Sequence, residues 1–453
     1  QDELTIEWVG IPGYQSVYEM HFLTPFPQHL WGSLAPADLL TSEISTRTPL
    51  GWGPYTIDEW VSGDHISLSR NPNYFRAAEG LPHFDFLVFR FTDTPEAALE
   101  ALLAGECDFV DRSAALEPLL SRVLELDSQG VLSAAIQSGT AWEQISFGVE
   151  SIDPARPKFF ASKEVRQAVA MCIDRQTISS SSIPGETLIP DTYVPVAHPL
   201  RNQDLQALQF DPQKAAELLQ LAGWIDFDAD PATPRVSAGV AGLPDGLPFE
   251  VVYLVPDDAE RPQVASQIVD SLAACGIRAE VDLWEWDSLL AAGPEGPIFG
   301  RQFDLAQFAW AYSIDPTCSL YTAAEIPGPY PEYPKGWGGG NAAGYRRAEF
   351  DQQCGQAQTS LPDNAQFLDA HQQAQALFTQ DLPALPLYQR PKVVAMRPDM
   401  CNLSIDPAFG NALSAIERLD YGNSCNQRIM YCVNAVKTHK YCTQWTISDF
   451  CGF

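Results

Sequence analysis

The sequence predicts an α/β protein with more than one lobe. Its 453 residues exceed what one ordinary core accommodates, so two or three compact units are expected. Hydrophobic residues make up 45% of the chain, enough to bury a sizeable core. Through the middle of the chain, short apolar runs alternate with amphipathic helical patterns. That alternation favours parallel strands covered by helices.

The first part of the chain predicts a hairpin followed by a strand, helix, strand unit. Residues 1–48 mix short alternating runs with proline-containing loops and end in a short helix. "YTIDEWV" and "HISLSR", separated by the turn "SGD", predict a β-hairpin over residues 55–70. "FDFLVFRF" predicts an apolar strand, and the helix that follows it ends at Gly105 and leads into another strand.

The middle of the chain predicts a second α/β lobe. A helix is expected from Ala161, with Ser162 as its cap, and another from Pro212, capped by Asp211 and closed by Gly223. The remaining expected elements are strands over 249–255, 278–286, 303–310 and 386–398, helices over 261–277 and 363–380, and an irregular segment over 311–345.

Charge and hydropathy exclude several partners. The formal net charge is −31, from 58 acidic and 27 basic residues, which disfavours nucleic acid and anionic lipid as partners. No run of 18 apolar residues is present, so the sequence predicts no membrane-spanning helix.

The ten cysteines favour disulfides formed outside the reducing cytosol, with buried free thiols as the alternative. No CxxC pair and no zinc-like Cys/His spacing occurs, so no metal is expected. Two pairs are proposed, Cys318 with Cys354 and Cys401 with Cys425, because each encloses a loop that a crosslink would restrain.

No enzyme motif is present: the chain contains no GxxxxGK[ST], HExxH or GxSxG. Asp226, Asp228 and Asp230 begin an EF-hand-like spacing, but Pro231 stands where glycine is needed, so a solvated turn is expected. Aromatic residues gather instead in or beside loops, where they suit a sugar or a peptide side chain. Ordinary core packing is the alternative for each of them, and the set is Trp142, Trp310, Tyr312, Tyr321, Tyr330, Tyr333 and Trp337.

A set of segments resembles one family. "GWGPYTIDEWVSGDHISLSRNPNYF", "SKEVRQAVAMCIDRQTI", "FDPQKAAELLQLAGW", "SLAACGIRAEV" and "FDLAQFAWAYSIDP" occur in the order and spacing of the peptide/nickel class (family 5) of extracytoplasmic solute-binding proteins that serve ABC importers. The resemblance implies a two-lobed, periplasmic-binding-protein-like (type II) α/β receptor that closes on its ligand by a hinge. It implies no catalytic step and no cofactor.

The resemblance also implies a division of the chain. Residues 1–137 would be the remaining part of lobe I, 138–392 lobe II, and 393–426 a return segment to lobe I. Residues 427–453, which carry a net charge of +2 (three basic residues less one acidic) and three cysteines, form a basic tail of unknown role.

The family pattern has more chain before the glycine turn than the 48 residues found here, so we expect an N-terminally truncated receptor. Within that turn, Gly51 and Gly53 would provide a positive φ or a close backbone approach.

The expected ligand is a short peptide, with oligosaccharide as the alternative and nickel chelates or opines as further possibilities. The proposed ligand-binding residues, from loop position and residue type, are Trp310, Tyr312, Ser313, Asp315, Trp142, Glu143, Trp337 and Asn341. Tryptophans would stack on the ligand, while Asp315 and Glu143 would accept hydrogen bonds or pair with a cation. Asp315 stands later in its loop than the acidic residue of peptide-binding members. This displacement favours the alternative that the ligand is a sugar.

Two alternative functions belong to other classes of protein. A secreted hydrolase would need a paired-carboxylate, metal or nucleophile constellation that the sequence does not display. A surface assembly protein would use the cysteine-rich tail for intermolecular crosslinks. The preferred reading is a monomeric, extracytoplasmic receptor of the periplasm or cell surface, whose partners are a small ligand and the transmembrane subunits of an ABC permease. A lipid anchor on a missing N-terminus is one option for its attachment.

Overall fold

The computed structural model describes residues 26–182, 188–230, 233–311, 316–362, 364–405, 413–422 and 425. These residues fall into two compact units, one formed by residues 139–390 and the other by residues 26–138 and 391–425. We call them unit 1 and unit 2. The chain passes between them twice, inside one strand at 138/139 and inside another at 390/391. The four-part division stays a prediction, because the tail lies outside the described residues.

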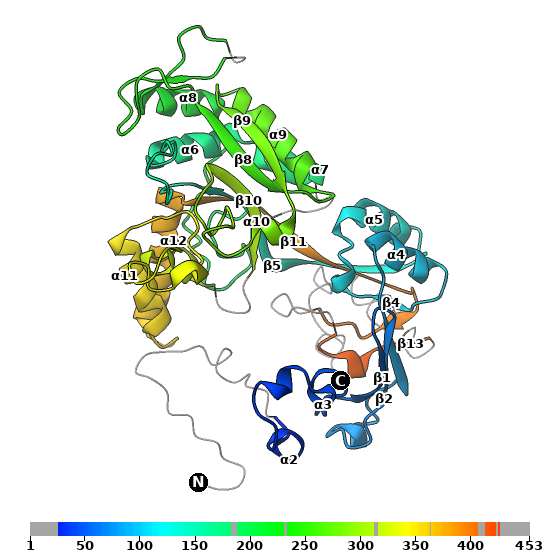
Figure 1. Cartoon of the computed structure of the whole chain (residues 1–453). Coiled ribbons are helices and arrows are strands. Elements are labelled where there is room, and N and C mark those ends of the chain that lie inside the picture. The colour runs from blue at the N-terminus through cyan, green and yellow to red at the C-terminus, as the bar shows by residue number, and fades with distance from the viewer. Residues whose placement is uncertain are drawn as a thin grey trace. The chain divides into compact units, whose positions relative to one another are not determined.

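Unit 1 is built on a mixed sheet with helices packed against it (Figure 1). Its strands are β5 (Ser133–Phe147), β6 (Trp224–Ile225), β7 (Val236–Ser237), β8 (Glu250–Pro256), β9 (Arg278–Trp284), β10 (Leu305–Ala311) and β11 (Ala384–Met396). Its helices are α6 (Lys163–Cys172), α7 (Arg175–Ser182), α8 (Pro212–Leu221), α9 (Arg261–Ala273), α10 (Trp286–Leu289), α11 (Ala348–Thr359) and α12 (Ala365–Asp381).

The main sheet of unit 1 has the strand order β11-β5-β10-β8-β9. The pairs β8/β9 and β10/β8 are parallel, as the strand and helix alternation predicts, whereas β10 and β5 are antiparallel. Helix α9 connects β8 to β9 and packs alongside both strands. Parallel neighbours place their carboxyl ends at one edge of a sheet, so β8, β9 and β10 end on the same side.

Local chemistry explains where the helices of unit 1 begin and end. The Asp211 carboxylate accepts a hydrogen bond from the Lys214 amide at 3.0 Å, and Pro212 opens α8, as predicted. Gly223 adopts φ +90°, and a Cβ there would lie 2.8 Å from a backbone oxygen. Ser162 does stand before α6, but its hydroxyl donates to Glu164 and does not cap the helix.

Unit 2 contains a three-stranded antiparallel sheet with small helices. Its elements are α2 (Gln28–Trp31), α3 (Glu43–Thr46), β1 (Tyr55–Val61), β2 (His65–Arg70), β3 (Phe86–Arg90), α4 (Pro95–Leu103), β4 (Phe109–Val110), α5 (Leu120–Ser128), β12 (Met400–Cys401) and β13 (Asp420–Tyr421). Strands β1 and β2 form the predicted hairpin. The apolar strand β3 lies at the sheet edge, with Phe86 73% and Val88 64% exposed.

The glycine turn before the hairpin works differently from the prediction. Neither Gly51 nor Gly53 has a left-handed φ, and a Cβ on either would meet no close neighbour, so the predicted role of these glycines is wrong. Asn71 holds the turn instead. Its side-chain amide donates to the Gly53 carbonyl at 2.9 Å, and its backbone amide donates to the Pro54 carbonyl at 2.8 Å.

Three disulfides crosslink the described residues. Cys318–Cys354 and Cys401–Cys425 confirm the two predicted pairs. The third, Cys172–Cys275, joins the end of α6 to the residues after α9 and was not predicted. Among the described helices, none combines the length and apolar character that crossing a bilayer requires.

Candidate functional site

The candidate site lies at the edge of the unit 1 sheet where β8, β9 and β10 end. Because β5 runs antiparallel to β10, the unit 1 part of β5 begins at this same edge. The register places Trp310 opposite Trp142, and Ala309 opposite Glu143. Two predicted ligand-binding tryptophans, 168 residues apart by number (310 minus 142), are therefore neighbours on adjacent strands.

The two tryptophans differ in exposure. Trp142 is only 2% exposed, and its indole N–H donates to the Gln144 side-chain oxygen at 2.9 Å. Trp310 is partly exposed and packs edge-on against Phe308 and Phe299, with ring centroids 5.6 and 6.4 Å away. Trp142 therefore supports the strand pair from the core, while Trp310 presents an indole surface at the strand end.

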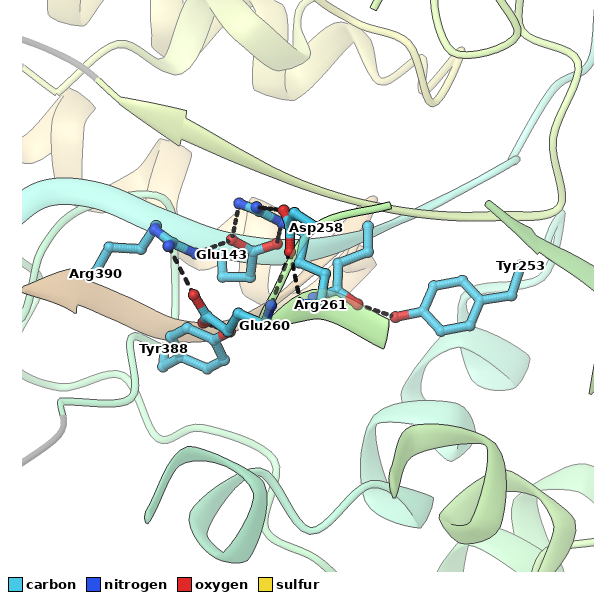
Figure 2. A network of polar contacts seen from close by, with 8 residues as sticks. Glu143, Tyr253, Asp258, Glu260, Arg261, Tyr388 and Arg390 are labelled. Carbon is cyan, nitrogen blue, oxygen red and sulfur yellow. Dashed lines mark hydrogen bonds and ion pairs between the residues drawn. The ribbon is translucent and has the colours of Figure 1, made fainter. Parts of the chain in front are cut away.

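Glu143 is the centre of a buried network of charges (Figure 2). Its side chain is 0% exposed. One carboxylate oxygen accepts from Arg261 Nε at 2.7 Å, and the other accepts from Arg261 Nη2 at 2.8 Å and Arg390 Nη1 at 2.9 Å. Arg261 also pairs with Asp258, and Arg390 donates to Glu260 at 2.8 Å. Glu143 does pair with cations, but both belong to this chain.

The network controls the ionisation of Glu143. Burial alone would raise the pKa of its carboxyl group, because a charge is costly in a dry interior. The attraction of Arg261 and Arg390 and the hydrogen bonds from both outweigh burial and hold the pKa below its usual value. Glu143 is therefore ionised at neutral pH. A buried carboxylate with two guanidinium partners is held in place, which suits positioning better than ligand exchange.

Two further tryptophans at this edge were not singled out from the sequence. Trp284 ends β9 and Trp286 begins α10, and both remain partly exposed while packing on the cluster that also contacts Trp310. The Arg261 guanidinium lies over the Trp286 ring at 4.6 Å from its centroid. The signal was available, since both tryptophans stand at the end of the predicted strand 278–286, and parallel strands place their carboxyl ends at one edge of a sheet.

The other predicted ligand-binding residues fall in two groups. Asn341 is 1% exposed, and its side chain makes three hydrogen bonds with the Thr322 carbonyl and the Tyr345 backbone, so it stabilises its own loop. Trp337 is partly exposed, and its ring packs where a Cβ on Gly293 would lie 2.2 Å away. Tyr312, Ser313 and Asp315 lie outside the described residues, so their roles stay predictions.

The described residues offer no cluster of metal ligands. Across the described ranges, no group of three or more His, Cys, Asp or Glu side chains is arranged to hold a metal ion. The loop with Asp226 and Asp228 instead hydrogen-bonds itself, since Asp226 accepts from the Ala229 amide at 2.8 Å and Asp228 from the Thr233 hydroxyl at 2.9 Å. This arrangement is the predicted solvated turn.

Comparison with known proteins identifies a family. The profile described as "Bacterial extracellular solute-binding proteins, family 5 Middle" matches residues 13–328. The oligopeptide-binding protein AppA of Bacillus subtilis is 25% identical over 375 residues, covering 82% of this chain and 62% of that protein. A putative ABC transporter peptide-binding protein of Brucella ovis is 31% identical over 250 residues, covering 52% of this chain and 43% of that protein. The chain thus spans less than two thirds of the length of both relatives.

Solved structures share the fold. AppA from Bacillus subtilis, in complex with a nonapeptide, superimposes with a TM-score of 0.64 at 22% identity, over 88% of this chain and 72% of that one. NikA from Brucella suis, in complex with Fe(III)-EDTA, gives 0.66 at 19% identity, over 83% and 69%. These similarities confirm the predicted two-lobed α/β fold class.

Proposed function

The chain belongs to the bacterial extracellular solute-binding proteins, family 5, and from that premise we propose that it captures short peptides outside the cytoplasm and delivers them to an ABC permease. The observation that carries the proposal is the family match over residues 13–328. Curated relatives named as peptide-binding proteins support the ligand class. The proposed activity is binding and release, with no catalytic step.

The sheet edge of unit 1 supplies a physical basis for the proposed capture of peptides. Trp310, Trp284 and Trp286 offer partly exposed indole faces on one apolar cluster, which suits the side chains of an extended peptide. Glu143 takes part indirectly, by holding the Arg261 guanidinium against the Trp286 ring. Binding through aromatic faces is tolerant of sequence, as a receptor for varied peptides requires.

A thermal-shift screen followed by calorimetry tests the ligand class. The probes are a pool of random tetrapeptides and nonapeptides, a pool of oligosaccharides, and Ni(L-His). A ligand at roughly 100 times its Kd adds about 2.7 kcal/mol to folding stability, which raises Tm measurably. A rise with peptides alone supports the proposal. A rise with sugars or the nickel chelate alone would replace the ligand class, and no response from a folded sample would overturn capture of these solutes.

A matched pair of variants tests the site. Trp310→Ala removes an indole at the sheet edge and is expected to weaken peptide binding about tenfold or more, since a buried aromatic anchor contributes on the order of 2 kcal/mol. Phe227→Ala removes a similarly large aromatic, 77% exposed in a loop of the same unit, and should leave Kd unchanged. Equal effects from both variants would argue against the assigned edge.

Two finer features remain proposals. We expect a monomer, which light scattering of the purified chain tests against a disulfide-linked oligomer. Lipid anchoring is checked by mass spectrometry of the protein isolated from its own cells, where an acylated N-terminus would support it and an unmodified one would contradict it.

A further inference from the structure

We propose that the C-terminal tail, residues 427–453, docks on the exposed edge strand β3 of unit 2 and is held there by a disulfide between Cys107 and Cys432. The tail lies outside the described residues. The proposal goes beyond ligand capture, because it concerns how the chain covers an apolar surface of unit 2.

The docking surface lies on β3, at the edge of its sheet. Phe86, Val88 and Arg90 alternate along this strand, so their side chains point to one face of the sheet. Phe86 is 73% and Val88 64% exposed, and Arg90 pairs with Glu106 at 2.7 Å. We call Phe86, Val88, Arg90, Glu106 and Cys107 the β3 surface. An edge strand with large exposed apolar side chains calls for a covering segment.

Cys107 places a thiol on this surface. It directly follows Glu106, the partner of Arg90. Burial raises the pKa of the Cys107 thiol, and the nearby Arg90 charge opposes the rise. The thiol is only partly buried, and Cys107 makes no disulfide within the described residues.

The cysteine count places the possible intramolecular partners of Cys107 in the tail. Of the ten cysteines, six form the three disulfides described above. The other four are Cys107, Cys432, Cys442 and Cys451, an even set that allows two crosslinks. Unpaired thiols are uncommon in proteins made for oxidising compartments. We assign Cys107 to Cys432, the tail cysteine nearest to the described chain, which leaves Cys442 to pair with Cys451.

The end of the described chain lies close to the segment of Cys107. The Gly422 amide donates to the Asp399 carbonyl at 3.0 Å. Arg397 pairs with the Asp399 carboxylate at 2.6 Å and with the Asp108 carboxylate at 2.9 Å. Because Asp108 directly follows Cys107, a short series of contacts joins the start of the tail to the β3 surface.

The tail also fits the β3 surface in length, apolar character and charge. Cys432 stands ten residues after Gly422 (432 minus 422), which an extended chain spans over up to about 33 Å. The run "IMYCV", residues 429–433, surrounds Cys432 with apolar side chains. The tail carries a net charge of +2, whereas residues 26–138 and 391–425 carry −11 (9 basic less 20 acidic), so the two attract each other.

Formation of the crosslink is an oxidation. The thiols of Cys107 and Cys432 lose two protons and two electrons as the S–S bond forms. A small-molecule or protein disulfide of the extracytoplasmic compartment takes them up and becomes two thiols.

Peptide mapping under non-reducing conditions tests the pairing. The full chain, purified from an oxidising compartment, is alkylated while folded and digested, and its crosslinked peptides are identified by mass spectrometry. We expect a peptide pair that joins Cys107 to Cys432, with Cys107 unmodified by the reagent. Alkylation of Cys107 in the folded chain, its linkage to Cys442 or Cys451, or a dimer linked through Cys107 would overturn the proposal.

A matched pair of variants tests the docking surface. In a glutathione redox buffer, the ratio of crosslinked to reduced Cys107 and Cys432 measures the effective concentration of the tail at the β3 surface. Val88→Ser removes an apolar contact and should lower this ratio about tenfold. The control is Val131→Ser, since Val131 is 48% exposed elsewhere in unit 2, and it should leave the ratio unchanged.

Both valines are exposed, so both variants are expected to fold. A wild-type ratio in Val88→Ser, or an equal fall in Val131→Ser, would contradict docking on the β3 surface. Neither experiment uses a ligand, so a failure of peptide capture leaves both results independent.

Discussion

Unit 1 and unit 2 are stabilised in different ways. Unit 1 encloses a charge network around the fully buried Glu143 and stacks Trp224 on Phe249 at 4.1 Å between ring centroids. In unit 2, the sheet of β1, β2 and β3 keeps large apolar side chains in solvent, including Phe86 and Val88. Many of its ion pairs are exposed, for example Arg90 with Glu106, whose side chains are 50% and 56% accessible.

The difference indicates that unit 1 is the more stable of the two units. We therefore expect unfolding in two steps, with unit 2 opening at lower denaturant concentration and unit 1 later. Four changes test this contrast, in order of decreasing expected effect.

Replacing Cys172 and Cys275 by serine should destabilise unit 1 most. The crosslink closes a loop with a sequence separation of 103 residues, for which the chain-entropy estimate is about 4.7 kcal/mol. Urea unfolding followed by tryptophan fluorescence should show the later transition moving toward the earlier one. If the earlier transition moved instead, the assignment of transitions to units would be wrong.

Glu143→Gln should cost unit 1 about 3–5 kcal/mol, because the buried Arg261 and Arg390 lose a shared counter-charge. The matched control is Glu250→Gln, whose pair with Arg278 is exposed, with side-chain accessibilities of 44% and 59%, and should change stability by about 0–1 kcal/mol. Urea midpoints of the two variants give the comparison directly, and similar losses would contradict it.

Replacing Cys401 and Cys425 by serine should act on unit 2 alone. The loop has a sequence separation of 24 residues, which corresponds to about 3.4 kcal/mol by the same estimate. Only the earlier transition should shift. A shift of both would show that the units unfold together.

Lowering the pH should weaken the charge network around Glu143 and reduce the stability of unit 1 by a smaller amount. The folded pKa of Glu143 lies below its unfolded value, so its contribution to stability is fully present above about pH 4.3 and is lost as pH falls through the folded pKa. Stability of unit 1 measured by urea titration should therefore decline below that pH more steeply in wild type than in Glu143→Gln. Parallel curves would indicate that other carboxyl groups dominate.

Local sequence signals predicted much of the fold. The spacing of Asp211, Pro212 and Gly223 located α8, and the turn "SGD" located the hairpin of β1 and β2, because these signals act within a few residues. The helix α11 was missed although Phe350, Cys354 and Ala357 stand at helical spacing, because its segment lies just after an irregular stretch.

Contacts between segments far apart in the chain could not be predicted from the sequence. Glu143 was proposed as a ligand-binding group, yet its partners Arg261 and Arg390 lie 118 and 247 residues away along the chain. No spacing rule connects such residues, because only the sheet order brings them together. For the same reason, β3 was expected as an apolar strand without any indication that Phe86 and Val88 would face solvent.

The order of the cysteines along the chain has a consequence for how the protein is made. Each disulfide joins a cysteine to the next one in sequence: Cys172 to Cys275, Cys318 to Cys354, and Cys401 to Cys425. A chain emerging N-terminus first into an oxidising compartment can thus complete each crosslink before the next pair arrives. Among the cysteines that the structure describes, Cys107 is the exception, since it emerges before Cys172 and offers it a wrong first partner. Burial raises the pKa of the Cys107 thiol, which lowers the fraction of reactive thiolate. If the chain folds around Cys107 before Cys172 arrives, a wrong disulfide between these two cysteines is suppressed without an isomerase.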